Sequence, residues 1–260
     1  MRLVRSTIHL IRSDMPPPFL AARWEDLVLL NYLCPAQVLA PLVPRGTVLD
    51  TWNGETMVSL VGFLFRDTRV VGFRVPFHRT FEEVNLRLYV RRTTTSGEIR
   101  RGVVFVRELV PRHAIAALAR WMYNEPYLSV PMEHRLSLSD ADGGTVNYSW
   151  SYRGGPFAIG AEVSGSARLP APASEAAFIT EHYWGYTRQR NGDTLEYHVA
   201  HPPWRVWETA SARFSGAGRA LYGPAFGEVL STAPHSAFVS TGSEVTVHRG
   251  LRVATDSLPR

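Results

Sequence analysis

One stretch of the chain shows a clear alternation of apolar and polar positions. Between residues 81 and 90, four aliphatic residues fall on one side of an extended strand: Val84, Leu86, Leu88 and Val90. The other side carries Phe81, Glu83, Asn85, Arg87 and Tyr89. A carboxylate, an amide and a guanidinium between two aromatic rings suit the inner wall of a small closed β-sheet that holds a ligand. The alternative is a sheet face that is open to solvent.

The segment that follows predicts a hairpin and then a helix. A turn at 95–97 (Thr-Ser-Gly) leads into a strand over 101–109, which Pro111 ends. Apolar residues at spacings of three and four predict a helix over 114–123. Arg112 and His113 would then lie at a strand-to-helix junction, a common place for catalytic residues. The alternative for His113 is a residue that begins the helix and faces water.

The rest of the chain predicts more strands than helices. Expected strands run over 19–32, 57–66, 156–169, 237–239 and 244–248, and expected helices over 36–42 and 174–183, the latter capped by Ser174. Hairpins are predicted across the turns at 142–144 and 191–193. Short connections favour antiparallel pairing. We therefore expect a mostly β (α+β) fold in which an arm, 1–18, precedes a single domain, 19–260.

Composition narrows the possible functions. The net charge is +5, yet the chain contains no lysine, so all 28 basic residues are arginine. Without a lysine amine, no side chain can form a Schiff base. The arginines are spread along the sequence without an aromatic-basic motif, so nucleic-acid binding is not expected. We also expect no membrane span and no secretion signal, and the single cysteine, Cys34, suits the cytoplasm. Homo-oligomer formation stays open.

The motif search is mostly negative. The sequence has no glycine-rich phosphate loop, no dinucleotide fingerprint, no HExxH and no GxSxG, so no cofactor is expected. His198 and His201 lie near Glu196, but this spacing on a strand does not converge on one metal ion, and no metal site is predicted. His182, Trp184 and Tyr186 alternate onto one predicted face. They could line a pocket for an acid or carbonyl compound, or form an aromatic cluster between packed elements.

Several blocks of the sequence, in order, resemble a known family. They are PLVPRGTVLDTWNGETMVSLVGFLFRDTRV, FEEVNLRLYVR, GVVFVRELVPRHAIAALARWMYNEPY and HYWGYTRQRNGDTLEYHVAHPPWRVW. These blocks are similar to the DUF2071 (YqjF-like) family of uncharacterised bacterial proteins, which is related to the acetoacetate decarboxylase-like superfamily. The resemblance implies a cone-shaped antiparallel β-barrel with a few helices and an internal pocket for a small oxo-acid.

The resemblance also implies site residues. The superfamily's enzymes use a lysine just after a strand that ends in Arg-Glu-Leu and a proline, and Arg107, Glu108, Leu109 and Pro111 match this motif. Arg112 and His113 stand where the lysine would be. Glu83 looks like the superfamily's glutamate, and Arg23 like its carboxylate-binding arginine. By this resemblance, the chain has counterparts of the superfamily's glutamate and arginine, Glu83 and Arg23, but no counterpart of its lysine.

Two functional hypotheses and a structural one remain. The first is a binding module for a small organic acid or carbonyl compound. The second is a lysine-independent lyase, hydrolase or isomerase that acts on an oxo-acid or enol-lactone, with Glu83 as acid or base and His113 as proton partner. Developing charge would be stabilised by Arg112, Arg87 or a protonated His113. The third is a structural role, in which Glu83 pairs with an arginine. The expected ligand contacts are Arg23, Asn85, Arg87, Arg107, His182, Trp184 and Tyr186.

Overall fold

The structure is a computed structural model that describes residues 18–74, 80–111 and 126–253. Four predicted features lie outside these ranges: nearly all of the arm over 1–18, the helix over 114–123, and the candidate residues Arg112 and His113. The expectations made for them stay predictions.

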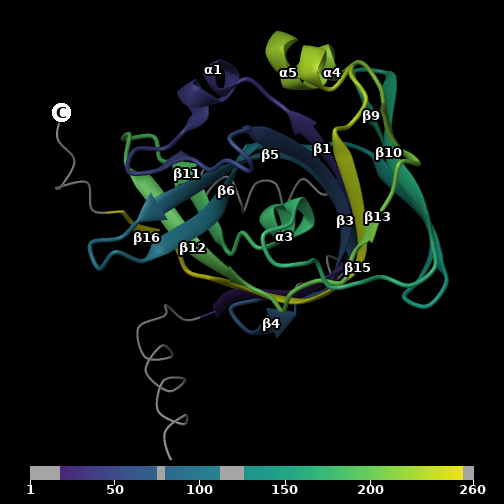
Figure 1. The fold of residues 1–260 in the computed structure, drawn as a ribbon, viewed down its shortest axis with the longest axis horizontal. Helices are drawn as coiled ribbons and strands as arrows, with labels where there is room; N and C mark the ends of the chain where they lie inside the picture. The colour runs from purple at the N-terminus through teal and green to yellow at the C-terminus, as the bar shows by residue number, and fades with distance from the viewer. Residues whose placement is uncertain (1–17, 75–79, 112–125, 254–260) are drawn as a thin grey trace, which may run out of the picture.

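The main sheet closes into a ring of strands, seen end-on in Figure 1. In ring order the strands are β1 (Pro18–Leu33), β3 (Met57–Val70), β5 (Phe81–Thr93), β6 (Ile99–Val110), β11 (Trp184–Arg188), β12 (Thr194–Ala200) and β15 (Ser236–His248). β12 closes the ring on β15, where Val199 faces Val247. The mostly β fold class predicted from the sequence is confirmed.

One junction of the ring departs from the predicted antiparallel pairing. β6 and β11 run parallel, and Trp184 and Gly185 face Gly102 and Val103. The strands approach closely here, since a Cβ added at Gly102 would collide with the backbone of Trp184. Glycine is therefore required at position 102 for the ring to close. Hairpin turns join the antiparallel neighbours β5–β6 and β11–β12, as predicted.

Short strands and a second sheet complete the β-structure. The short strands are β2 (Val48–Leu49), β4 (Phe73–Arg74), β7 (Tyr127–Ser129), β13 (Trp207–Glu208) and β16 (Leu251–Arg252). The second sheet contains β8 (Met132–Ser139), β9 (Gly143–Tyr152), β10 (Gly155–Ser164) and β14 (Ala212–Ser215). It packs on the outside of the ring, where Tyr148 and Trp150 join ring residues in one apolar cluster, the outer core. Both aromatic residues are buried there.

The helices of the described ranges are short. They are α1 (Ala36–Leu39), which continues as a 3-10 turn over Ala40–Leu42, α3 (Glu175–Thr180), α4 (Gly218–Tyr222) and α5 (Pro224–Val229). In Figure 1, α3 lies at the centre of the ring. Ser174 caps the N-terminus of α3 as predicted, because its hydroxyl accepts a hydrogen bond from the Ala177 amide at 3.2 Å. Phe178 and Ile179 pack in a second apolar cluster inside the ring, the inner core.

The alternation of β5 separates the two cores. Leu86 and Leu88 belong to the outer core, whereas Phe81 and Tyr89 belong to the inner core. The polar residues between those two rings therefore face the inside of the ring, and they are 3% (Glu83), 2% (Asn85) and 9% (Arg87) exposed. The prediction of an inner wall is confirmed, and the alternative of a solvent-facing sheet is wrong.

Several element boundaries differ from the sequence predictions. The two tail strands predicted over 237–239 and 244–248 are one strand, β15, because both segments pair continuously with β1. β3 extends four residues beyond its predicted end at Arg66, and β10 ends at Ser164 rather than at Leu169. α4 and α5 were not predicted, since each is too short to show a helical period.

A bulge in β6 changes which side chains face the inside of the ring. Arg87 pairs with Phe105 and Leu86 with Arg107, so Val106 is an extra residue in β6. The bulge reverses the alternation: Arg107 lies opposite Leu86 of the outer core, and Glu108 lies opposite Asn85. An unbroken alternation would place Arg107 inside. The strand pattern alone could not show this shift.

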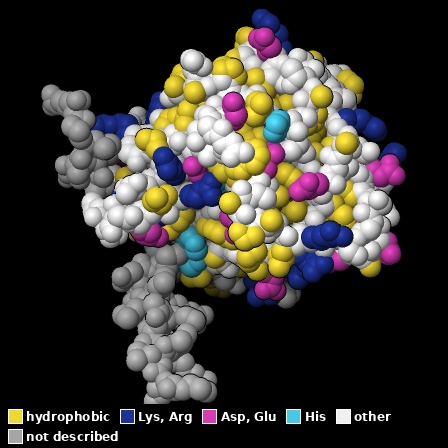
Figure 2. Space-filling model, in the orientation of Figure 1, with side chains coloured by type: hydrophobic (Ala, Val, Ile, Leu, Met, Phe, Trp, Pro, Cys, Tyr) yellow, Lys and Arg dark blue, Asp and Glu magenta, His cyan; other side chains and the backbone are white. Residues whose placement is uncertain are grey.

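The view in Figure 2 shows acidic and basic side chains dispersed over one face of the molecule, between apolar and neutral ones. Because the two signs are intermixed, this face carries no extended basic surface of the kind that follows a nucleic-acid backbone. None of the helices within the described ranges has the length and apolar character needed to cross a membrane.

Candidate functional site

The inner face of β5 carries a small polar group around Glu83. The Asn85 side-chain amide donates a hydrogen bond to Glu83 Oε1 at 3.0 Å, and the Tyr127 hydroxyl donates to Glu83 Oε2 at 3.3 Å. Tyr127 comes from β7, which lies parallel to β6 with its first residue opposite Glu108. Two neutral donors from different strands therefore hold one buried carboxyl group.

Burial changes the acidity of Glu83. Removal of the carboxyl group from water raises its pKa from the usual 4.5 to about 7, while the hydrogen bonds from Asn85 and Tyr127 and the charge of Arg87 oppose this rise. Near neutral pH, both the acid and the carboxylate are then populated. A group with these properties can donate or accept a proton at physiological pH.

Arg87 is a buried cation with unusually few partners. Its Nη2 donates a long hydrogen bond, 3.4 Å, to the backbone carbonyl of Ile179 on α3, and its guanidinium lies 5.7 Å from the ring centre of Tyr89. Its Nε is buried and has no hydrogen-bond partner among the described residues. Among the residues that the structure describes, no carboxylate lies within ion-pair distance of this guanidinium.

A second polar group lies between α3 and the short strand β2. His182 Nε2 lies 3.1 Å from Asp50 Oδ2, and Arg101 Nε donates to the same oxygen at 2.7 Å. The His182 ring packs against Tyr89 and Phe178, at 4.7 and 5.0 Å between ring centres. Burial lowers the pKa of His182 to about 4. Burial also favours the protonated form of Asp50, but the hydrogen bonds from His182 and Arg101 outweigh it and lower the pKa of Asp50 to about 2.

A chain of hydrogen bonds ties the inner face of the ring to α3. The Ser59 hydroxyl donates to Asn31 Oδ1 at 2.6 Å, so it accepts from the Tyr89 hydroxyl, 2.5 Å away. Asn31 Nδ2 donates to Ser236 Oγ at 3.0 Å, and Ser236 donates to Glu175, the first residue of α3. This series of hydrogen bonds links β5, β3, β1 and β15 to α3, and it holds the helix inside the ring.

Of the predicted site residues, four lie together: the catalytic candidate Glu83 and three of the expected ligand contacts. Glu83, Asn85 and Arg87 share the inner face of β5, and His182 contacts the same inner core through Tyr89. Their functional roles stay predictions, because position alone does not demonstrate a ligand.

Two arginines that were predicted to contact the ligand lie elsewhere. Arg23 is a surface residue of β1 whose Nε donates to Glu25 at 2.6 Å, with 48% of the Arg23 side chain exposed. Arg107 lies on the outer-core side of β6, where its charge opposes the pKa rise that burial causes at Tyr222 of α4. The bulge at Val106 is the reason for the position of Arg107. Both residues thus point away from Glu83.

The prediction that His182, Trp184 and Tyr186 share one face is wrong. β11 begins at Trp184, so His182 lies in the connection after α3 and does not continue the alternation of the strand. Trp184 and Tyr186 pack with the outer core, and His182 contacts inner-core residues. An alternating pattern holds only while the backbone stays extended.

Sequence reasoning missed three residues that line the interior, Asp50, Glu108 and Tyr127, and the partly exposed Arg101 that binds Asp50. Asp50 and His182 are 132 positions apart, and nothing local in the sequence pairs them. Glu108 was identified only as part of a motif, and it faces inward because of the bulge. Across the described ranges, no three His, Cys, Asp or Glu side chains gather in a way that could hold a metal ion.

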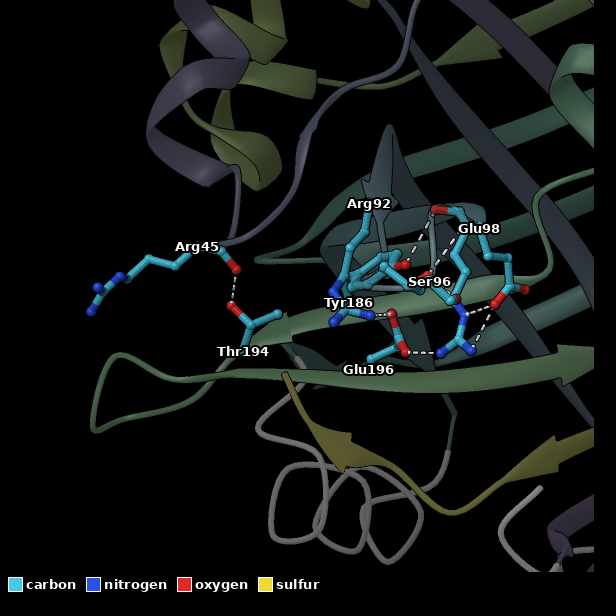
Figure 3. Close-up of polar contacts among 9 residues, drawn as sticks. Arg45, Arg92, Ser96, Glu98, Tyr186, Thr194 and Glu196 are labelled. Carbon is cyan, nitrogen blue, oxygen red and sulfur yellow. Dashed lines mark hydrogen bonds and ion pairs between the residues drawn. The ribbon is translucent and has the colours of Figure 1, made fainter. Parts of the chain in front are cut away.

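A contrasting charged group lies at the hairpin ends of the same strands. Figure 3 shows Arg92 of β5 directed at Glu196 of β12. Glu196 receives hydrogen bonds from Arg92 Nη1 at 3.1 Å and Arg100 Nη1 at 2.6 Å, and Arg100 also binds Glu98 at 2.9 Å. The Arg100 guanidinium lies 4.2 Å from the ring centre of Trp184. All of these charges are paired, which is typical of a structural cluster.

Solved structures with the same architecture define the class of fold. The enduracididine biosynthesis enzyme MppR complexed with pyruvate superposes with a TM-score of 0.66 at 14% identity and covers 94% of this chain and 93% of its own. Acetoacetate decarboxylase from Legionella pneumophila superposes with a TM-score of 0.61 at 14% identity, covering 93% and 90%. The closed ring of strands is thus the acetoacetate decarboxylase-like fold; identities this low show the fold alone.

The family follows from the sequence comparison. Residues 21–244 match DUF2071, described as an uncharacterized conserved protein, and the chain belongs to this family. The uncharacterized protein YqjF of Bacillus subtilis is 29% identical over 198 residues, which are 74% of this chain and 76% of the relative. The resemblance drawn from the sequence blocks is confirmed.

Proposed function

We propose that the protein binds a small organic acid or carbonyl compound inside the ring of strands, without Schiff-base chemistry. The observation that carries this proposal is the state of Arg87. Its guanidinium is buried, it makes one long hydrogen bond to a backbone carbonyl, and its Nε has no hydrogen-bond partner in the described part of the chain.

The energetics of burial give this observation its meaning. An isolated charge that is removed from water costs several kcal/mol unless a partner of opposite charge compensates it. Arginine also presents planar pairs of donors that match a carboxylate. A ligand with a carboxylate or an enolate oxygen would supply the missing partner of Arg87.

The surroundings of Arg87 favour a ligand of this kind. Glu83 has a pKa of about 7, so near neutral pH much of it is uncharged and repels an anion less than an ordinary carboxylate would. Within the described ranges, the buried Oδ1 of Asn85 has no hydrogen-bond partner, so it can accept a hydrogen bond from a ligand. Tyr89 and Phe178 provide apolar walls for a short carbon skeleton. The group therefore combines a cation with neutral polar and apolar contacts.

A protein of the same fold lends support. MppR is described in complex with pyruvate, a small acid that also carries a carbonyl group. The present chain has no lysine, so a ligand here would be held by hydrogen bonds and charge and not by an imine. We therefore include 2-oxo and 3-oxo acids among the candidate ligands.

Thermal denaturation with a panel of small acids tests the proposal. Pyruvate, acetoacetate, lactate and propionate are added to the purified chain, and at least one is expected to raise Tm with increasing concentration. Arg87→Gln should abolish this shift, whereas Arg91→Gln, an exposed arginine of the same strand, should leave it unchanged. Absence of any shift across the panel, or equal shifts in both variants, would overturn the proposal.

The acidity of Glu83 favours a second, enzymatic function. As a carboxylate, Glu83 would accept a proton from the carbon next to the ligand carbonyl. The electron pair of the broken C–H bond would move to the carbonyl oxygen, and Arg87 would stabilise the enolate that forms. Reprotonation of that carbon by Glu83 returns the keto form. Arg112 and His113, outside the described ranges, keep their predicted roles in this step.

Exchange of carbon-bound protons in D₂O tests this enzymatic function. NMR spectra of pyruvate with the wild-type chain should show deuterium entering the methyl group faster than in buffer. Glu83→Gln should lower the rate to that of buffer, and Glu133→Gln, at an exposed carboxylate, should not. If Glu83→Gln exchanged as fast as the wild type, Glu83 would not be the base.

A further inference from the structure

A buried histidine inside the ring has features that a purely structural residue would not need. The side chain of His182 is 1% exposed, and its Nε2 lies 3.1 Å from Asp50 Oδ2. Its other nitrogen, Nδ1, is buried without a hydrogen-bond partner among the described residues. A buried polar atom left without a partner costs about 1–3 kcal/mol, so it calls for an explanation.

The position of the proton on His182 follows from its partner. Asp50 is ionised, because Arg101 and His182 hold its pKa near 2, and a carboxylate only accepts hydrogen bonds. Nε2 must therefore carry the hydrogen and donate it to Asp50. Burial keeps the ring neutral, so Nδ1 has a free lone pair. His182 thus presents a hydrogen-bond acceptor.

This acceptor lies in the same region as the proposed ligand. The ring of His182 contacts Tyr89 and Phe178 of the inner core. The charge of Arg87 acts on His182, and Arg87 bonds to the carbonyl of Ile179, three residues before it. Arg87 and His182 therefore suit two different groups of one ligand. Arg87 attracts an anionic group, and His182 Nδ1 accepts a hydrogen bond from a donor.

We propose that His182 Nδ1 accepts a hydrogen bond from a hydroxyl group of the bound acid, so that the protein selects hydroxy acids over the same acids without the hydroxyl. This inference rests on the proposed binding function and specifies its ligand class. Asp50 is the positioning residue: it fixes the proton on Nε2, and Arg101 holds Asp50 in place through the 2.7 Å hydrogen bond. A site that hydrogen-bonds a substrate hydroxyl discriminates against an analogue that lacks it.

Matched pairs of acids test the selection. Lactate is compared with propionate, and 3-hydroxybutyrate with butyrate, by calorimetric titration of the wild-type chain. The hydroxy acid of at least one pair should bind about tenfold more tightly, which corresponds to one buried hydrogen bond. Binding of both members with equal affinity would overturn this inference and leave the proposed binding function intact. If no acid bound, the proposed function itself would fail.

Two substitutions test whether the loss of the acceptor at His182, and not a general change in the fold, removes the preference for the hydroxy acid. His182→Phe keeps a ring between Tyr89 and Phe178 and removes both ring nitrogens, while Asp50 keeps its hydrogen bond from Arg101. The preference for the hydroxy acid should then fall to about onefold, while the acid without the hydroxyl binds as before. His134→Phe, at a half-exposed histidine paired with Glu82, is the matched control and should keep the preference. A retained preference in His182→Phe would overturn the proposal.

Imidazole ¹⁵N spectra provide a readout that needs no ligand. The wild-type spectrum should show His182 with its proton on Nε2, and Asp50→Ala should shift the ring toward the other tautomer or a mixture. A purely structural Asp50 would change stability without changing the tautomer. A wild-type ring protonated on Nδ1 would contradict the assignment, whatever the titrations show.

Discussion

Two carboxylates of similar burial, Glu83 and Glu196, have opposite surroundings. They are 3% and 6% exposed, respectively. Glu196 receives hydrogen bonds from two guanidinium groups, at 3.1 and 2.6 Å. Glu83 receives hydrogen bonds from an amide and a phenol, at 3.0 and 3.3 Å, and its pKa is raised to about 7. Burial alone therefore does not decide the charge of a carboxyl group, since the partners do.

The arginines show the same contrast from the cationic side. Arg100 contacts two carboxylates and lies over an aromatic ring, whereas Arg87 donates its hydrogen bond to a backbone carbonyl and is more deeply buried. A cluster in which every charge is paired serves the fold. An interior in which the cation and the acid are kept apart from ionic partners retains the capacity to bind or react with a ligand.

The largest effect is expected where the paired carboxylate is removed. Glu196→Ala leaves Arg92 and Arg100 without their shared partner, and the free energy of unfolding should fall by about 3 kcal/mol. Urea denaturation measures this loss. If the variant folds, the Tm shift caused by added small organic acids should persist. A loss below about 0.5 kcal/mol would show that the cluster does not stabilise the ring.

Glu83→Gln should act in the opposite direction, through pH. The pKa of Glu83 is about 7 in the folded state, whereas the usual value, which applies to the unfolded chain, is 4.5. The folded state therefore binds the carboxyl proton more tightly. Below pH 4.5 the carboxyl group is protonated in both the folded and the unfolded state, so it does not destabilise the fold. As the pH rises from 4.5 to about 7, the unfolded chain loses this proton first, and the free energy of unfolding falls. At pH 8 the cost is on the order of 3 kcal/mol.

Glu83→Gln should therefore stabilise the protein at pH 8 and have little effect at pH 4. Denaturation curves at both pH values measure the difference between variant and wild type. Glu98→Gln, at an exposed carboxylate of the paired cluster, is the control and should not reproduce this pH dependence. Equal effects of Glu83→Gln at both pH values would mean that Glu83 stays ionised throughout.

Arg87→Gln should change the stability of the empty protein less. Removal of an uncompensated buried cation relieves a desolvation cost, so the free energy of unfolding should stay the same or rise by about 1 kcal/mol. Arg100→Gln, within the paired cluster, should lower it by about 1–2 kcal/mol. Chemical denaturation without added acids compares the two. A large loss of stability in Arg87→Gln would assign Arg87 a structural role.

The smallest effect is expected in the neutral hydrogen-bond chain. Tyr89→Phe removes the hydroxyl that donates to Ser59 but leaves Ser59 bonded to Asn31, so the loss should be about 1 kcal/mol. Thermal denaturation is sufficient to measure it. A loss above about 3 kcal/mol would show that the linked hydrogen bonds stabilise α3 as one cooperative unit.

Much of the inner wall could be predicted from the sequence, because side-chain direction in a strand depends only on parity. The alternation over 81–90 placed Glu83, Asn85 and Arg87 on one face before any fold was known. Ser174 marked the start of α3 for a similar reason, since capping involves residues three positions apart. The absence of lysine likewise excluded a Schiff base on any side chain without a structure.

Other features depended on contacts between distant segments. The bulge at Val106, which turns Arg107 outward and Glu108 inward, arises from pairing with β5. Asp50 meets His182 across 132 positions, and Glu196, not Glu83, receives the arginines. Local periodicity determines which way a side chain points while the backbone stays regular. The charge and partners of that side chain depend on the low-dielectric interior, which forms only when remote strands close the ring.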